Sequence, residues 1–100
     1  MSLLDFSKFQ KLHGEWSDKT FGIREPKAPL HHLKKEVQEV IDQPYDIQEY
    51  ADCFLLLMDS ARIAGFNMDD LYFASFEKFM INQNRQWGKP DENGVVEHIR

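Results

Sequence analysis

Four acidic residues occur as two pairs with the same spacing. Glu36 and Glu39 form the first pair, Glu49 and Asp52 form the second, and the two members of each pair are three positions apart. In an α-helix this spacing places both carboxylates on one face, one turn apart. A single pair of this kind is common on solvated helices, but two pairs on neighbouring helices are more specific.

The segment between the two acidic pairs is short. Only Gln43, Pro44 and Tyr45 separate the expected helices, so we expect these helices to pack antiparallel as a hairpin. The four carboxylates then lie close together and repel one another. Because Mg2+ prefers oxygen ligands, the sequence predicts a Mg2+ site in which Mn2+ can substitute. The alternative is a solvated acidic face in which Glu49 is only the acid of a helix cap.

Basic and amide side chains recur on a later segment. Lys78, Asn82 and Arg85 stand at offsets of 0, 4 and 7, which is one face of a helix. Lys and Arg are common phosphate ligands, and Arg offers a bidentate fork. Trp87 follows and could stack on a base. The alternative is a solvated basic face near a helix C-terminus, where cations are favoured in any case.

Five further residues are candidates to line a pocket beside the acids: His13, Trp16, Phe21, His32 and Asp59. His32 precedes Glu36 by one helical turn and could contact the base or support a metal ligand. Asp59 lies in an apolar segment, where a carboxylate is costly unless it is paired or binds a metal. For the aromatic candidates and His13, an ordinary place in the core is the alternative.

Apolar periodicity predicts four helices and an irregular tail. The expected helices cover about residues 3–18, 29–42, 46–64 and 67–87, and the tail covers 88–100. Ser2, Asp46 and Asn67 are suited to cap the first, third and fourth helices, and Gly65 to end the third. The third helix is apolar on most faces, so we expect it at the centre or at a subunit interface. The fold class is therefore all-α, with one domain over residues 1–100.

The packing side expected for the fourth helix is formed by Leu71, Tyr72, Ser75, Phe76 and Phe79. This set follows the spacing of one helix face.

Composition narrows the class of protein. The 100 residues have a mass of 11.8 kDa and a net charge of -5, which argues against a nucleic-acid-binding module with a basic stripe. The longest purely apolar run, Phe54–Met58, is far too short to span a membrane, and the first residues do not read as a signal peptide. Cys53 is the only cysteine, so an intrachain disulfide is excluded. A cytoplasmic protein is expected.

Several segments carry a resemblance to a known family. Glu36-Val37-Gln38-Glu39 followed by Glu49-Tyr50-Ala51-Asp52 resembles the signature of the all-α nucleoside triphosphate pyrophosphohydrolases, the MazG-like superfamily. The segments His32–Glu36, Ala51–Gly65, Asn82–Pro90 and Gly94–Ile99 are more similar to the small, often phage-borne dATP/dGTP diphosphohydrolases. The resemblance covers about residues 9–100. One departure is Lys35, which stands where the superfamily signature usually has a further acid.

The resemblance implies a reaction and an assembly. A (deoxy)nucleoside triphosphate, with dGTP or dATP the leading choices, is cleaved to the monophosphate and pyrophosphate. Glu36, Glu39, Glu49 and Asp52 would hold about two or three Mg2+ ions. The four-helix unit would form a homodimer or homotetramer, in the host cytoplasm if the protein is encoded by a phage.

The resemblance also implies roles for individual residues at the phosphates and at the base of the substrate. Among the acids, Glu36 and Glu39 are the catalytic candidates, with Glu39 chosen to accept the proton of the attacking water. Lys78, Asn82 and Arg85 would grip the phosphates. Asp59 would orient a ligand, add a metal contact or accept from a purine amino group.

Two alternatives remain open. One is a non-catalytic, cation-binding helical oligomerisation module. The other is the same chemistry on a pyrimidine or modified nucleotide. A carboxylate-bridged di-iron bundle is disfavoured, because such bundles use Glu-x-x-His pairs and this chain has none.

Overall fold

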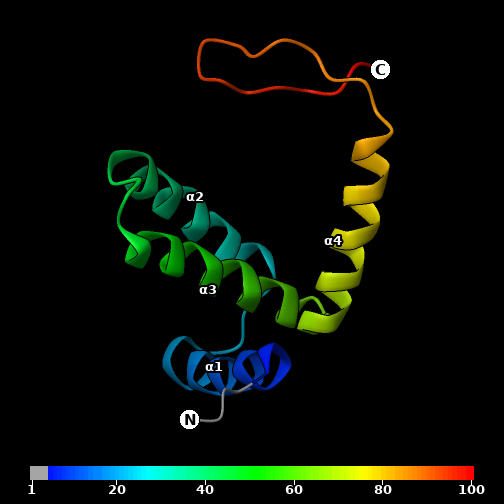
Figure 1. Ribbon diagram of the computed structural model, residues 1–100. Coiled ribbons are helices and arrows are strands. Elements are labelled where there is room, and N and C mark those ends of the chain that lie inside the picture. Colours follow the sequence, from blue (N-terminus) through cyan, green and yellow to red (C-terminus); the bar gives the residue numbers. More distant parts are fainter. Residues whose placement is uncertain (1–4) are drawn as a thin grey trace.

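The computed structural model describes residues 5–100 and contains four α-helices (Figure 1). They are α1 (Phe6–Phe21), α2 (Lys27–Asp42), α3 (Ile47–Ile63) and α4 (Met68–Gln83). The described residues form no strand beyond an isolated antiparallel bridge between Trp87 and His98 in the tail. The expected all-α fold class is confirmed. None of the described helices is long and apolar enough to cross a membrane.

The helix starts follow from side-chain caps. Asp46 accepts a hydrogen bond of 2.9 Å from the Gln48 amide, as its cap position predicts. Asn67 and Asp70 form a reciprocal capping box with bonds of 2.8 and 3.0 Å. The cap of α1 is Asp5, which accepts from the Lys8 amide. Ser2, the expected cap, lies outside the described residues.

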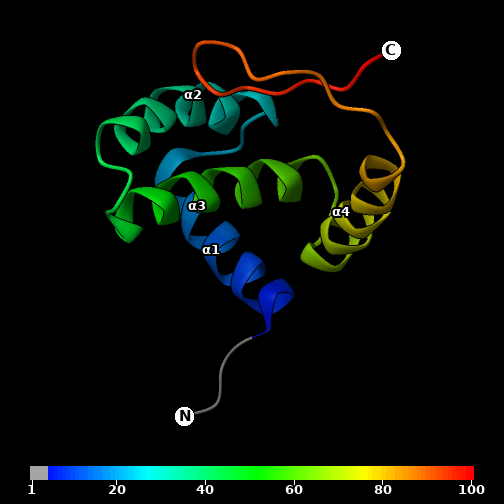
Figure 2. The same ribbon diagram turned by 45° about the horizontal axis from the view of Figure 1, so that its top comes forward.

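Helix α3 lies at the centre, as its apolar sequence predicts. It packs antiparallel against α2 on one side and crosses α1 on the other (Figures 1 and 2). Gly14 of α1 allows the close approach, because a Cβ there would collide with the side chain of Arg62 from α3. The Ser60 hydroxyl donates to the carbonyl of Pro26 at 2.8 Å and ties α3 to the start of α2. Gly65, with φ of 98°, ends α3 as expected.

Helix α4 stands away from the α2–α3 hairpin and packs mainly against α1 (Figure 1). It ends at Gln83 rather than near Trp87, which corrects the expected boundary. The reason is that the Asn82 carbonyl accepts from the Arg85 amide at 3.3 Å and from the Trp87 indole at 2.9 Å. These bonds tighten the chain into a turn and take the acceptor that a continuing helix would use.

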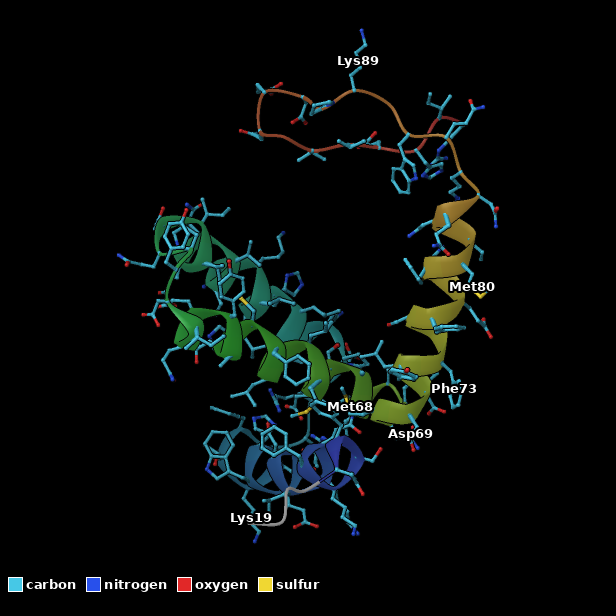
Figure 3. The ribbon with its side chains drawn as sticks, in the orientation of Figure 1. Lys19, Met68, Asp69, Phe73, Met80 and Lys89 are labelled. Carbon is cyan, nitrogen blue, oxygen red and sulfur yellow. The ribbon has the colours of Figure 1, made fainter. Side chains whose placement is uncertain are left out.

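The side of α4 that was expected to pack is largely uncovered within one chain. Tyr72 is 69% exposed, Phe76 53% and Phe79 56%. Phe73, beside them, is 66% exposed, and its side chain extends outward from α4 (Figure 3). So many aromatic side chains on one helix form an apolar surface of the kind that marks an interface.

Candidate functional site

The α2–α3 hairpin brings the four acidic side chains together. One carboxylate oxygen from each of Glu36, Glu39, Glu49 and Asp52 lies within 4.8 Å of the others. Glu36 and Glu49 are half-buried, whereas Glu39 and Asp52 are exposed. Carboxylate oxygens at this separation are suited to bind a hard divalent cation. We call these residues the carboxylate cluster.

The cluster holds uncompensated negative charge. Its only ion pair within residues 5–100 joins Glu36 Oε1 to His32 Nε2 at 3.0 Å, and no Lys or Arg there pairs with any of the four acids. Burial of its carboxyl, a hydrogen bond with Glu39 and the neighbouring acids raise the pKa of Glu49. Glu49 Oε2 is buried without a hydrogen-bond partner. The arrangement favours an added cation.

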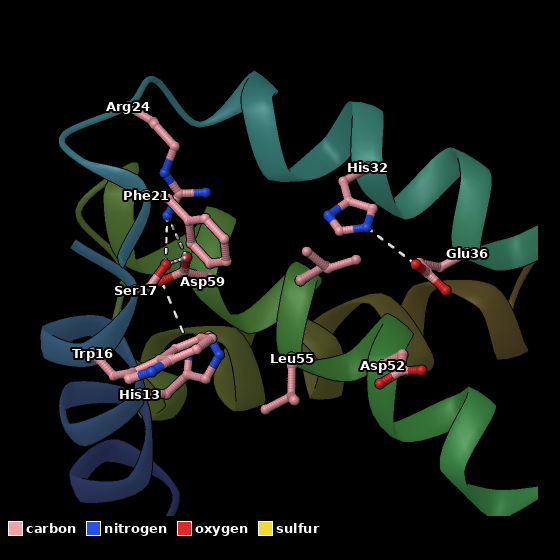
Figure 4. Close-up of a pocket in the computed structure, with 11 residues that line it drawn as sticks. His13, Trp16, Ser17, Phe21, Arg24, His32, Glu36, Asp52, Leu55 and Asp59 are labelled. Carbon is pink, nitrogen blue, oxygen red and sulfur yellow. Dashed lines mark hydrogen bonds and ion pairs between the residues drawn. The ribbon is translucent and has the colours of Figure 1, made fainter. Parts of the chain in front are cut away.

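A pocket of about 280 Å3 opens beside the cluster (Figure 4). Glu36 and Asp52 line one end of it. Five of the six residues expected to contact the base or line a pocket lie around it: His13, Trp16, Phe21, His32 and Asp59. The sixth, Trp87, does not. The rings of Trp16 and Phe21 meet edge to face with their centroids 5.4 Å apart, and His13 lies 5.5 Å from Trp16. The pocket therefore joins an acidic end to an aromatic end.

Asp59 is the centre of a buried ionic network at the aromatic end (Figure 4). The side chain is 2% exposed, and its Oδ2 accepts from the Ser17 hydroxyl at 2.7 Å and from Arg24 Nη2 at 2.9 Å. Its Oδ1 accepts from Arg62 Nε at 2.9 Å, and Arg62 also holds Asp18 through two bonds. We call these five residues the Asp59 network. Two arginines balance two aspartates within it.

The network fixes the charge states around it. Burial alone would raise the pKa of Asp59, but hydrogen bonds from Ser17, Arg62 and Arg24 outweigh it and hold that pKa below its usual range. Burial lowers the pKa of His13, and the positive charges of Arg62 and Arg24 act in the same direction against the attraction of Asp59. His13 is therefore neutral near pH 7, with its Nδ1 buried and without a hydrogen-bond partner.

Sequence reasoning missed the other four members of the network, Ser17, Asp18, Arg24 and Arg62. Arg24 lies in the loop between α1 and α2, a segment read only as a connection. The signal was the cost of burying Asp59, which requires cations nearby. Arg62, one turn after Asp59 on α3, is the partner that spacing could have identified.

The α4 residues do not reach the cluster within one chain. Neither the pocket nor the carboxylate cluster includes any residue of α4 or the tail. Lys78 and Asn82 line a shallow groove on α4, and Arg85 lies beyond the helix end with its Nη1 3.3 Å from Asn82 Oδ1. Trp87 packs edge to face against His98 at 6.0 Å.

Comparison with known proteins gives consistent results. A model of the dATP/dGTP pyrophosphohydrolase family matches residues 9–100. The chain is 41% identical to the Eaa protein of Salmonella phage P22 over 93 residues, which are 93% of this chain and 29% of that protein. It is 37% identical to a dATP/dGTP diphosphohydrolase of Salmonella phage PMBT28 over 91 residues, which are 90% of this chain and 30% of that protein. The chain thus spans about three tenths of the length of these relatives.

A solved structure shares the whole fold. It is the MazG-like pyrophosphohydrolase of cyanophage S-2L bound to dGDP and three catalytic Mn2+ ions per active site. The TM-score is 0.80 at 28% sequence identity, with 98% of this chain and 100% of that chain covered. The four-helix architecture expected from the sequence is therefore a MazG-like one.

Proposed function

Because this chain belongs to the dATP/dGTP pyrophosphohydrolase family, we propose that it hydrolyses a purine deoxynucleoside triphosphate, dGTP or dATP, to the monophosphate and pyrophosphate. The observation that carries the proposal is the cluster of four carboxylates within 4.8 Å at one end of the pocket. An anionic cluster cannot bind a triphosphate directly, so the activity requires a divalent cation. Mg2+ is the proposed metal, and Mn2+ substitutes for it.

The roles of the residues follow from their positions. Glu36, Glu39, Glu49 and Asp52 hold the cations. When bound, the cations neutralise the triphosphate and lower the pKa of the attacking water. Glu39, an exposed member of the cluster, accepts the proton of that water. His32 orients Glu36 through their 3.0 Å contact.

The aromatic end of the pocket receives the base. Trp16 and Phe21 offer ring surface there, and both are more than half exposed within one chain. A bound purine would cover this surface by stacking. Since the phosphates must lie at the carboxylate cluster, the nucleotide extends from Glu36 and Asp52 toward Trp16 and Phe21.

A second copy of the chain completes the site. The α4 face with Tyr72, Phe76 and Phe79 is exposed, and Lys78 and Arg85 stand away from the acids of their own chain. Packing of two or four copies would cover the aromatic face and bring these cations, with Asn82, to the triphosphate of a neighbouring subunit. Trp87 would reach that neighbour's pocket by the same route. Since the relatives are phage proteins, we place the reaction in the cytoplasm of an infected host.

A nucleotide panel tests the reaction. Each of the eight common (d)NTPs is incubated with the protein and Mg2+ or Mn2+, and the products are separated by anion exchange. We expect monophosphate and pyrophosphate from purine substrates, and none in EDTA. Release of single phosphate would indicate another hydrolase. A pyrimidine preference would move the proposal to the alternative substrate, and no turnover of any nucleotide would favour a non-catalytic module.

Subunit mixing tests the shared site separately. Glu36→Gln lacks a functional cluster, and the double variant Lys78→Met/Arg85→Met lacks the phosphate grip. If each site combines acids from one chain with cations from another, equal mixing restores about a quarter of the wild-type activity. If each chain supplies both parts itself, the mixture remains as inactive as its components, and the shared site is excluded.

A further inference from the structure

Arg24 is held in place more firmly than a loop arginine usually is. Its Nη2 donates to Asp59 Oδ2 at 2.9 Å and to the Ser17 hydroxyl at 2.5 Å, and its Nε donates to the Gly22 carbonyl at 3.3 Å. The guanidinium carbon lies 5.1 Å from the centroid of the Phe21 ring. The side chain is 20% exposed. Three anchors and a ring therefore fix the plane and direction of the guanidinium.

One donor group of this arginine remains available. No hydrogen bond within residues 5–100 uses Arg24 Nη1, which carries two N–H groups. In Figure 4 the bonded terminal nitrogen faces Ser17 and Asp59, and the other is directed away from them, toward the side where His32 lies. Arg24 lines the pocket. Its free donor therefore meets whatever occupies the aromatic end.

The charge around Arg24 selects the kind of acceptor. Asp59 and Asp18 balance Arg24 and Arg62, and His13 is neutral. In the proposed function the triphosphate is drawn to the opposite end, where the carboxylate cluster would hold the cations. A neutral hydrogen-bond acceptor on the base thus suits Arg24 better than a phosphate oxygen.

Asp59 does not itself form a hydrogen bond with the base. Both of its oxygens already accept hydrogen bonds, from Ser17, Arg24 and Arg62, and 2% of the residue is exposed. Its part is to position Arg24. Of the roles expected for Asp59, orienting another residue therefore fits best, and Asp59 is not a member of the carboxylate cluster.

We propose that Arg24 is a specificity-determining residue that donates from Nη1 to N7 of the purine base. N7 is an acceptor on both adenine and guanine, and pyrimidines have no counterpart. The inference rests on the proposed function and deepens it: a single fixed donor would admit both dATP and dGTP and disfavour dCTP and dTTP. Guanine O6 lies on the same edge, whereas adenine presents a donor there, so dGTP gains the better fit.

The test replaces one atom of the substrate. In 7-deaza-dGTP a C–H group stands where dGTP has N7, so the proposed hydrogen bond cannot form. We expect wild-type kcat/KM to be about tenfold lower for 7-deaza-dGTP than for dGTP, the value of roughly one hydrogen bond. In Arg24→Met the two substrates should become equivalent. Because the ratio is internal to each protein, partial unfolding of a variant does not affect it.

Two further variants separate positioning from recognition. Arg24→Lys keeps a cation for Asp59 and Ser17 but has no second terminal nitrogen, so it should stay folded and lose the discrimination. Lys27→Met removes the same charge three residues away, at a side chain that is 74% exposed and paired with Glu25. It should retain the wild-type ratio. A wild-type ratio near one, or an unchanged ratio in both Arg24 variants, overturns the proposed role of Arg24 but leaves the proposed function standing. Absence of pyrophosphate release from every nucleotide by the wild type overturns the proposed function and this inference with it.

Discussion

The two ends of the pocket differ in whether basic side chains balance their negative charge. At one end, four carboxylates lie within 4.8 Å of one another with no arginine or lysine paired to them in the described residues. At the other end, Asp59 is buried, and every oxygen it has accepts from a hydroxyl or guanidinium. Both ends draw on the same helix, since Asp52 and Asp59 stand two turns apart on α3.

The difference indicates that the carboxylate cluster, rather than the Asp59 network, is suited to bind a cation. The Asp59 network supplies its own cations, so it is complete as folded and contributes rigidity. In the carboxylate cluster the repulsion between the acids is unrelieved, which lowers the stability of the free protein, and the proposed cations would relieve it on binding. Neutralising an acidic residue should therefore have different consequences at the two ends: loss of activity in the cluster, and loss of stability at Asp59.

The largest effect is expected on activity. Neutralising one of the proposed metal ligands, in Glu36→Gln or Asp52→Asn, removes negative charge from the cluster and should reduce kcat/KM for dGTP by about 1,000-fold. Initial rates of pyrophosphate release at saturating Mn2+ measure it. Asp42→Asn, an acid at the exposed end of α2 outside the cluster, is the control and should remain active. Full activity of both cluster variants would exclude the proposed mechanism.

The next effect is on stability, and it uses a matched pair on one helix. Asp59→Asn leaves Arg24 and Arg62 with too little negative charge in a buried place, so the free energy of unfolding should fall by about 3 kcal/mol. Asp52→Asn makes the same chemical change in the cluster and should leave the metal-free protein as stable as the wild type or more so. Urea unfolding in EDTA measures both. Equal destabilisation by the two changes would remove the distinction between the ends.

The pH dependence of stability should have opposite signs at the two ends. The pKa of Asp59 is lowered by folding, so its contribution is present above the unfolded value of about 3.9 and is lost as the pH falls through the folded value. The pKa of Glu49 is raised, so ionising it costs stability as the pH rises through its folded value. In EDTA, Asp59→Asn should reduce the fall in the free energy of unfolding at acid pH. Glu49→Gln should reduce the fall that accompanies a rise in pH through the pKa of Glu49.

Identical pH profiles for the wild type and both of these variants would contradict the assignment. The profiles must be recorded without metal, because bound cations would stabilise ionised Glu49 and hide its contribution.

The smallest effect concerns the hydroxyl in the Asp59 network. Ser17 is 1% exposed, donates to Asp59 and accepts from Arg24. Ser17→Ala leaves both arginines in place, so we expect a loss of about 1 kcal/mol, one net hydrogen bond. Urea midpoints at pH 7 measure it. A loss as large as that of Asp59→Asn would mean that the hydroxyl, not the charge balance, holds the network together.

The sequence determined the local parts of this protein. Helix existence, the caps at Asp46 and Asn67 and the stop at Gly65 depend on side chains next to the backbone groups they satisfy. The carboxylate cluster was predictable for a similar reason. Each helix carries two acids one turn apart, and the four-residue connection between α2 and α3 leaves little freedom in where the hairpin places them.

The tertiary structure decided what depends on contacts between distant segments. Arg24 joins Asp59 across 35 positions and Arg62 joins Asp18 across 44, and no local pattern specifies such pairs. The end of α4 at Gln83 depends on Trp87 turning back to the Asn82 carbonyl, although the helical spacing continues to Arg85. The spacing and charge of Lys78 and Arg85 led us to expect them at the phosphates, close to the acids. In the fold they lie away from the acids of their own chain. Spacing fixes which side chains share a helix face, but only packing fixes which faces meet.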